Sequence, residues 1–193
     1  MWALIEDGSI TKIINQPKGM VIGDTRYSRN IFSFRWTNEE REAIGLYEIV
    51  FNDSNKRDTS YYTNTNQLFN FADGVVTASY GTATARELDD VTDEEDNVKA
   101  GLKSRHKEII KQEASVLLTP TDWHVIKATD VESYSVPSAV STFRNNVRTK
   151  SNEMETAIDN AADVDALAAL YKYTEQEDGS VTRPLGELPT LES

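Results

Sequence analysis

The residues most able to do chemistry lie in the stretch LLTPTDWHVI, residues 117 to 126. Asp122 and His124 flank Trp123 there, and a histidine with a carboxylate beside it is the usual pairing of a general base with its orienting group. The chain offers few other parts for catalysis, because it contains two histidines and no cysteine. A catalytic interpretation therefore depends on this pair.

A hydrolase built on Asp122 and His124 also needs a nucleophile. Ser133, Ser135 and Ser138 follow closely, but none lies in a G-x-S-x-G turn or another nucleophile elbow. Asp122 and His124 are two residues apart, so their side chains would point the same way in an extended segment. That spacing alone does not orient them for proton transfer. We predict no catalytic residue and keep a small hydrolase using this pair as the less favoured alternative.

The favoured interpretation makes the same three residues architectural. Asp122 follows the end of a helix and caps the next turn, Trp123 inserts its ring between two helices, and His124 lies at the rim. A tryptophan buries about 200 Å² and can dominate a small core. This interpretation predicts that Trp123→Ala costs about 3 to 5 kcal/mol of stability, far more than His124→Ala.

No metal or cofactor site is predicted from the remaining candidates. His106 lies between Leu102 and Ile110 on an apolar helical stripe, where a boundary histidine is more common than a ligand. The acids of residues 86–97 lack the glycine and the terminal glutamate of an EF-hand loop. The glycines are too scattered for a phosphate loop, and the lack of cysteine excludes disulfides and thiolate metal sites.

Composition and charge restrict the class of partner. A chain of 193 residues with 38% hydrophobic and 27% charged residues should fold into one ordinary domain or two small ones. Its formal net charge of -12 repels phosphate backbones and anionic lipid, so neither nucleic acid nor a membrane is an expected partner. No apolar run approaches about 18 residues, and acids stand where a secretory signal would need a basic start, so we expect a soluble protein made in the cytosol.

Residues 1–85 are typical of a small α+β module. Two Asp-Gly pairs, at residues 7–8 and 73–74, each separate two strand-like runs and so predict tight β-hairpins. Thr37 with Glu40 forms a capping-box pattern, which predicts a short helix over about 38–44 before the strand LYEIVF.

Between these elements, NDSNKRDTSYYTNTNQ reads as a polar loop. Its tyrosines, Tyr61 and Tyr62, are candidates either for packing or for a contact surface.

Residues 86–97 change composition abruptly and are expected to form an acidic linker. Thr92 with Glu95 gives a second capping-box pattern, followed by apolar residues at helical spacing up to about residue 118, where Pro120 ends the helix. This opens a helical module that we place at residues 98–175.

A second long helix is predicted after Pro137. Its narrow apolar stripe runs from Val140 to Ile158, and we expect it to pack antiparallel on the first helix within the subunit; self-association is the alternative. Asp163 is the expected cap of a last short helix. Residues 176–193 lack any periodicity and are expected to form an extended tail.

One combination of motifs resembles a known group of proteins. The helix ending in Leu117 and Leu118, the T-D-W motif at 121–123, and a following helix with Phe143 and an R-x-x-x-R pattern at Arg144 and Arg148 resemble bacteriophage tail assembly chaperone and tail-fibre assembly modules. The likeness covers about residues 98–148. The N-terminal pieces WALIE and RWTNEEREAIGLYEIV are similar to small α+β modules of phage tail-fibre-associated proteins.

The resemblance implies a non-enzymatic protein of phage assembly that binds other tail, fibre or baseplate proteins, located in the virion tail or in the host cytoplasm during assembly. A capsid decoration or head-fibre protein is the alternative within this class, and a homo-oligomer is possible in either. The candidate structural or partner-binding residues are Trp123, Asp122, Phe143, Arg144, Arg148, Tyr61 and Tyr62. The expected fold is α+β, with an N-terminal module of β-hairpins followed by a helical hairpin.

Overall fold

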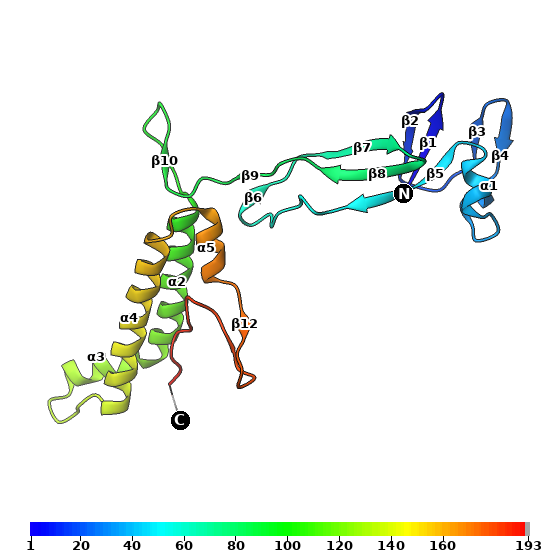
Figure 1. Cartoon of the computed structure of the whole chain (residues 1–193). Helices are drawn as coiled ribbons and strands as arrows, with labels where there is room; N and C mark the ends of the chain where they lie inside the picture. The colour runs from blue at the N-terminus through cyan, green and yellow to red at the C-terminus, as the bar shows by residue number, and fades with distance from the viewer. Residues whose placement is uncertain (192–193) are drawn as a thin grey trace. The chain divides into compact units, whose positions relative to one another are not determined.

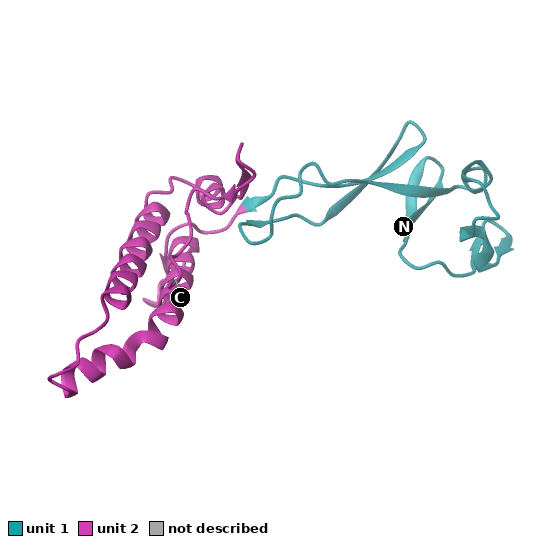
Figure 2. Ribbon diagram, turned by 90° about the horizontal axis from the view of Figure 1, so that it is seen from below, with its two compact units in different colours: residues 1–84 teal, residues 85–193 magenta. Residues whose placement is uncertain are grey.

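A computed structural model describes residues 1–191 and divides the chain into two compact units, residues 1–84 and 85–193 (Figures 1 and 2). Helices account for 35% of the chain and strands for 25%. The fold class is therefore α+β, as the sequence predicted. Helices α2 to α5 all belong to the second unit.

Unit 1 is built on a five-stranded sheet with the strand order β2-β1-β5-β8-β7. Most of its pairs are antiparallel, but β5 and β8 run parallel. The two edge strands, β2 and β7, approach each other, so the sheet is curled around its core. The strands of the sheet are β1 (Trp2–Glu6), β2 (Ser9–Ile14), β5 (Leu46–Asn52), β7 (Gln67–Ala72) and β8 (Val75–Tyr80).

Both predicted hairpins are confirmed. Asp7 and Gly8 join β1 to β2 with φ of 50° and 75°, and Asp73 and Gly74 join β7 to β8 with φ of 51° and 75°. Two successive positive φ angles define the type I′ turn, in which glycine and aspartate are tolerated where most residues are strained.

Strand β5 unites the sheet because its two halves pair with different strands. Leu46 to Glu48 pair with β1, and Ile49 to Asn52 pair with β8. The core on one side of the sheet is formed by Ala3, Ile49, Val76 and Ala78, with partly buried aromatic and aliphatic residues around them.

The short helix α1 (Asn38–Glu42) begins at the predicted capping box. The Thr37 hydroxyl accepts from the Glu40 amide, and the Glu40 carboxylate accepts from the Thr37 amide. Gly45 follows the helix with φ of 79°. The elements that complete unit 1 are β3 (Met20–Ile22), β4 (Thr25–Tyr27), the 3-10 helix η1 (Arg29–Phe32), β6 (Tyr62–Thr63) and, at the unit boundary, β9 (Thr84–Ala85).

Unit 2 is organised by two long helices, α2 (Leu102–Leu118) and α4 (Ser138–Asp159), which pack antiparallel (Figure 1). Lys107 of α2 pairs with Asp159 of α4 at 2.7 Å, and at the opposite end Leu118 contacts Arg144. The predicted stripe of α4 is buried along its length, which confirms the intramolecular pairing. Its buried members are Val140, Phe143, Val147, Met154 and Ile158.

Helix α5 (Val164–Leu170) begins where the sequence indicated. The Asp163 carboxylate accepts from the Ala166 amide at 2.7 Å. Its Val164 and Leu167 are buried, so this short helix covers part of the α2 and α4 pair.

The acidic segment 86–97 is folded, which corrects the prediction of a linker and of a capping box at Thr92. A hairpin forms from β10 (Val91–Thr92) and β11 (Val98–Lys99), and α2 starts only at Leu102. The Asp93 carboxylate closes the turn by accepting from the amides of Glu95 and Asn97. This local hydrogen bonding competes with helix formation, because aspartate side chains can replace helical backbone partners.

The segment after α5 is likewise more structured than an extended tail. Strands β12 (Thr174–Glu175) and β13 (Val181–Thr182) form a hairpin, and Leu185 is buried with its amide bonded to the Leu170 carbonyl at 3.0 Å. Leu185 and the partly buried Leu188 dock this polar segment, although it carries no periodic signal. Residues 192–193 of the predicted tail lie outside the described range.

Candidate interaction surface at the T-D-W corner

The chain between α2 and α4 forms a helical corner that the sequence analysis did not predict. A 3-10 turn, η2 (Thr119–Thr121), follows α2 directly, and helix α3 (Asp122–Asp130) follows η2. Pro120 occupies the first turn of η2, where its missing amide proton is not needed. Helix α2 thus ends at Leu118, as predicted from Pro120, and the chain turns there into η2 and α3.

Arg144 of α4 holds this corner in place. It is 9% exposed, and its Nη1 lies 3.0 Å from the Leu118 carbonyl oxygen, 2.5 Å from Thr121 Oγ1 and 2.7 Å from Asp122 Oδ1. Thr121 Oγ1 donates in turn to the Leu118 carbonyl at 2.7 Å. One guanidinium thus supplies charged hydrogen bonds to the end of α2, to η2 and to the start of α3.

Asp122 does not cap the turn, contrary to the prediction. The residue at the N-cap position of α3 is Thr121, whose side chain makes no capping bond, and the Asp122 carboxylate faces Arg144. An acid in the first turn of a helix is also favoured by the helix dipole. Asp122 therefore stabilises the corner through an ion pair with α4.

Trp123 is exposed, which corrects the prediction that it fills the gap between the helices. Its side chain is 52% exposed, and α3 contributes no buried residue at all. Because Arg144 and Thr121 occupy the inner side of the corner, the indole lies on its outer side, stacked on the His124 ring with centroids 3.7 Å apart.

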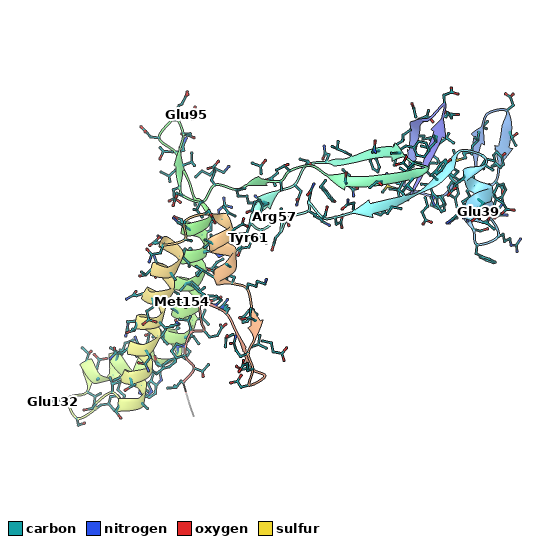
Figure 3. The ribbon with its side chains drawn as sticks, viewed as in Figure 1. Glu39, Arg57, Tyr61, Glu95, Glu132 and Met154 are labelled. Atoms are coloured by element: carbon teal, nitrogen blue, oxygen red, sulfur yellow. The ribbon has the colours of Figure 1, made fainter. Side chains whose placement is uncertain are left out.

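Polar and aromatic side chains from α3 and the following loop form one cluster around Tyr134. The Tyr134 hydroxyl lies 2.5 Å from His124 Nδ1, and the Lys127 ammonium lies 4.4 Å from the Tyr134 ring centroid. Val125 and Ile126 add exposed aliphatic groups, 42% and 61% exposed. We call Trp123, Val125, Ile126, Lys127 and Tyr134 the α3 surface. Figure 3 labels Glu132 in the loop that leads from it to α4.

The two residues of the hydrolase alternative have different partners. Asp122 is paired with Arg144, and His124 bonds Tyr134. The arrangement places an arginine, rather than the histidine, against the carboxylate. These residues therefore form a fixed helical corner with an exposed aromatic side chain, Trp123.

Phe143 and Arg148, the other two candidate residues of α4, differ in burial. Phe143 is buried in the core with Ala114 and Val147. Arg148 is exposed and makes a 3.4 Å bond to the Arg144 carbonyl.

In unit 1, Tyr61 is buried (Figure 3). Tyr62 is half-buried, and the Arg57 guanidinium lies 4.2 Å from its ring centroid. The structure therefore does not bring the tyrosines and the T-D-W residues together within one unit.

The other chemical candidates are part of the scaffold. His106 is half-buried with its ring against Tyr171, centroids 4.6 Å apart, and burial lowers its pKa. The Asp90 carboxylate accepts from the Gly101 amide, and this bond holds the pKa of Asp90 below its usual value. Within residues 1–191, no group of three or more acidic or histidine side chains is arranged to hold a metal ion. No helix in the same range is long and apolar enough to cross a membrane.

Comparisons with protein-family models, curated proteins and solved structures find no match to this chain. Sequence reasoning found Trp123 but missed Lys127 and Tyr134. Tyr134 is separated from the T-D-W motif by a helix that was not predicted. Val125 and Ile126, close to the tryptophan, were the available signal for an apolar segment.

Proposed function

We propose that this protein is a non-enzymatic bacteriophage tail protein that binds a fibre or baseplate partner through the α3 surface. The observation that carries the proposal is the exposure of Trp123, Val125 and Ile126 on a helix with no buried residue. Trp123 and Ile126 are three residues apart and therefore lie on the same side of α3, and exposed apolar side chains grouped in this way are typical of an interaction site. Tryptophan is among the residues most enriched at the energetic centres of interfaces.

The surface is fixed before any partner arrives. Arg144 binds both ends of the corner, and the Tyr134 hydroxyl bonds the His124 ring beneath the indole. A rigid contact surface loses less conformational entropy on binding than a flexible one. This supports a role in recognition for α3, while the buried Arg144 serves the scaffold.

The phage assignment rests on the resemblance of residues 98–148 to tail assembly modules. The acidic character of the chain suits protein partners better than nucleic acid or anionic lipid. The hydrolase alternative is not favoured, because Asp122 pairs with Arg144 and not with His124. A capsid decoration or head-fibre role would use the same kind of surface.

Mass spectrometry of purified particles and of the producing cells tests the assignment. Stoichiometric recovery in particles supports a virion component, and abundant protein in cells but not in particles supports an assembly chaperone. Labelling the protein on particles separates a tail position from a capsid position. Failure to bind any tail protein in either setting refutes the tail proposal.

Variants then test the surface itself. Trp123→Ala should abolish binding to the identified tail partner without unfolding the protein. Phe51→Ala is the matched control, because Phe51 is similarly exposed, at 49%, but lies in unit 1. Equal losses in both variants would contradict a specific role for α3.

A further inference from the structure

The chain exposes more surface than its mass accounts for. Its accessible area is 13056 Å² for 21.7 kDa. Two separate globular units of half this mass would together expose about 11,100 Å², so the excess is about 1,900 Å². A standard protein interface removes about 800 Å² from each partner, so the excess is sufficient for extensive contacts with another chain.

The most exposed large apolar side chain lies in unit 1, in the loop after η1. Phe34 is 95% exposed, whereas its neighbours Phe32 and Trp36 are partly buried. Phe32 packs edge-on against Trp2 at 5.7 Å between centroids, and Trp36 packs against Tyr27 at 5.9 Å. The chain thus anchors the residues on both sides of Phe34 and directs Phe34 itself into solvent.

A buried arginine makes this loop rigid. Arg41 of α1 is 6% exposed; its Nε donates to the Ile31 carbonyl at 2.8 Å, and its Nη2 donates to the Ser33 carbonyl at 2.5 Å. The Trp36 amide also donates to the Ser33 carbonyl, at 3.2 Å. Because these backbone groups are fixed, Phe34 is held as a protruding apolar knob.

The charge around the knob is opposite to that of unit 2. Residues 9–42, which include α1, contain six basic and four acidic residues, a net charge of +2, and Arg29 and Arg35 on either side of Phe34 are exposed. Residues 85–193 contain 22 acidic and 12 basic residues, a net charge of -10. The knob is therefore attracted to unit 2 of another copy of the chain.

Unit 2 has a groove whose chemistry fits the knob. The groove has a volume of about 630 Å³, which is typical of a ligand-binding site, and lies between α2 and the segment after β13. Its apolar lining includes Ile109, Val116 and Leu188, and Glu113 contributes a carboxylate. Glu187 also lines the groove, but its carboxylate is already paired with Arg183 at 2.8 Å. Ile109 and Val116 are 47% and 70% exposed, so the apolar lining is open to solvent.

We infer that the Phe34 knob of one copy docks in the α2 groove of a second copy, with Arg35 facing Glu113 of the groove. The contact is heterologous, since the two surfaces differ, and it therefore builds rings or open chains of copies rather than a closed twofold dimer. This inference is independent of the assignment to a phage tail.

Sedimentation velocity of the full chain over a wide concentration range tests the inference. Wild type should form species larger than the 21.7 kDa monomer, and Phe34→Ala should weaken association by about 30-fold or more. Val116→Lys should have a similar effect from the groove side. Val21→Ala is the control, because Val21 is 60% exposed but is not part of the knob.

Mixing the two defective variants provides the decisive measurement. Phe34→Ala keeps an intact groove and Val116→Lys keeps an intact knob, so together they should form a one-to-one dimer that grows no further. Arg35→Glu should weaken assembly, and Glu113→Arg in the same chain should restore it. Circular dichroism checks that each variant is folded.

Three results would overturn the inference. The first is a wild-type chain that stays monomeric at every concentration. The second is a Phe34→Ala chain that assembles like wild type, and the third is assembly that is lost only in Trp123→Ala, which would move the contact to the α3 surface.

Discussion

Replacing Arg144 with methionine should destabilise unit 2 more than any exposed substitution in it. Methionine keeps much of the side-chain volume but removes the guanidinium that bonds Leu118, Thr121 and Asp122. The corner between α2 and α4 would then lose its only described charged donor to these three groups.

The magnitude follows from the burial of each partner. Two hydrogen bonds from a charged donor to part-buried or buried acceptors are worth about 1.5 to 3 kcal/mol each. The Asp122 side chain is 49% exposed, so its ion pair adds only about 0 to 1 kcal/mol after solvent screening. Thr121 keeps its own bond to the Leu118 carbonyl, which reduces the loss. We expect a net cost of about 3 kcal/mol.

Urea melts followed by far-ultraviolet circular dichroism at the helical band measure this cost, because the long helices lie in unit 2. Arg148→Met is the matched control: it removes the same group from an exposed position with one 3.4 Å bond, and should cost less than about 0.5 kcal/mol. Equal midpoints for the two variants, or an Arg144→Met midpoint indistinguishable from wild type, would refute the assignment of Arg144 as the residue that holds the corner.

Three further changes have definite expected outcomes. Trp123→Ala should cost only about 1 kcal/mol in the same melts, because the half-exposed indole loses mainly its ring stacking; a loss of about 3 kcal/mol or more would favour the buried position that the sequence predicted. Gly101→Ala should cost about 2 to 3 kcal/mol, since the added Cβ would lie 2.3 Å from a backbone oxygen of the 86–97 segment. The control Gly179→Ala has open space around it and should cost about 1 kcal/mol for its positive φ. Equal thermal shifts for the two variants would contradict tight docking of the 86–97 segment on Gly101. Burial lowers the pKa of His106, so the unfolded chain binds more protons and unit 2 should lose stability as the pH falls below about 6.5. His106→Gln should therefore make the stability of unit 2 less dependent on pH between pH 7 and 5. An unchanged dependence of stability on pH would assign the loss to other groups.

Elements whose signals are local were predictable from the sequence. The Asp-Gly turns, the capping box at Thr37 and the cap at Asp163 each satisfy backbone groups within a few residues, so they form in the structure where the sequence placed them. The stripe on α4 was predictable for a related reason. Its apolar spacing requires a partner, and α2 was the other long helix predicted in the same module.

The position of Trp123 could not be predicted in this way. A large aromatic between two helices is usually buried, but the inner side of this corner is occupied by Arg144, which lies more than twenty residues away in the chain. No local pattern shows that a guanidinium will reach the end of α2. The outward orientation of the indole is therefore a consequence of tertiary packing.

The sequence by itself determined the α+β class, the turns, the helix caps and the apolar stripe that pairs the long helices, because each depends on backbone geometry or on periodicity within one segment. Only the tertiary structure decided which side chains face solvent. Arg144 and Arg41 are buried through bonds to distant backbone carbonyls, while Trp123 and Phe34 are exposed because their neighbours are the residues that pack. The burial of a side chain depends on which residues of other segments pack against it. The spacing of residues along one segment does not contain that information.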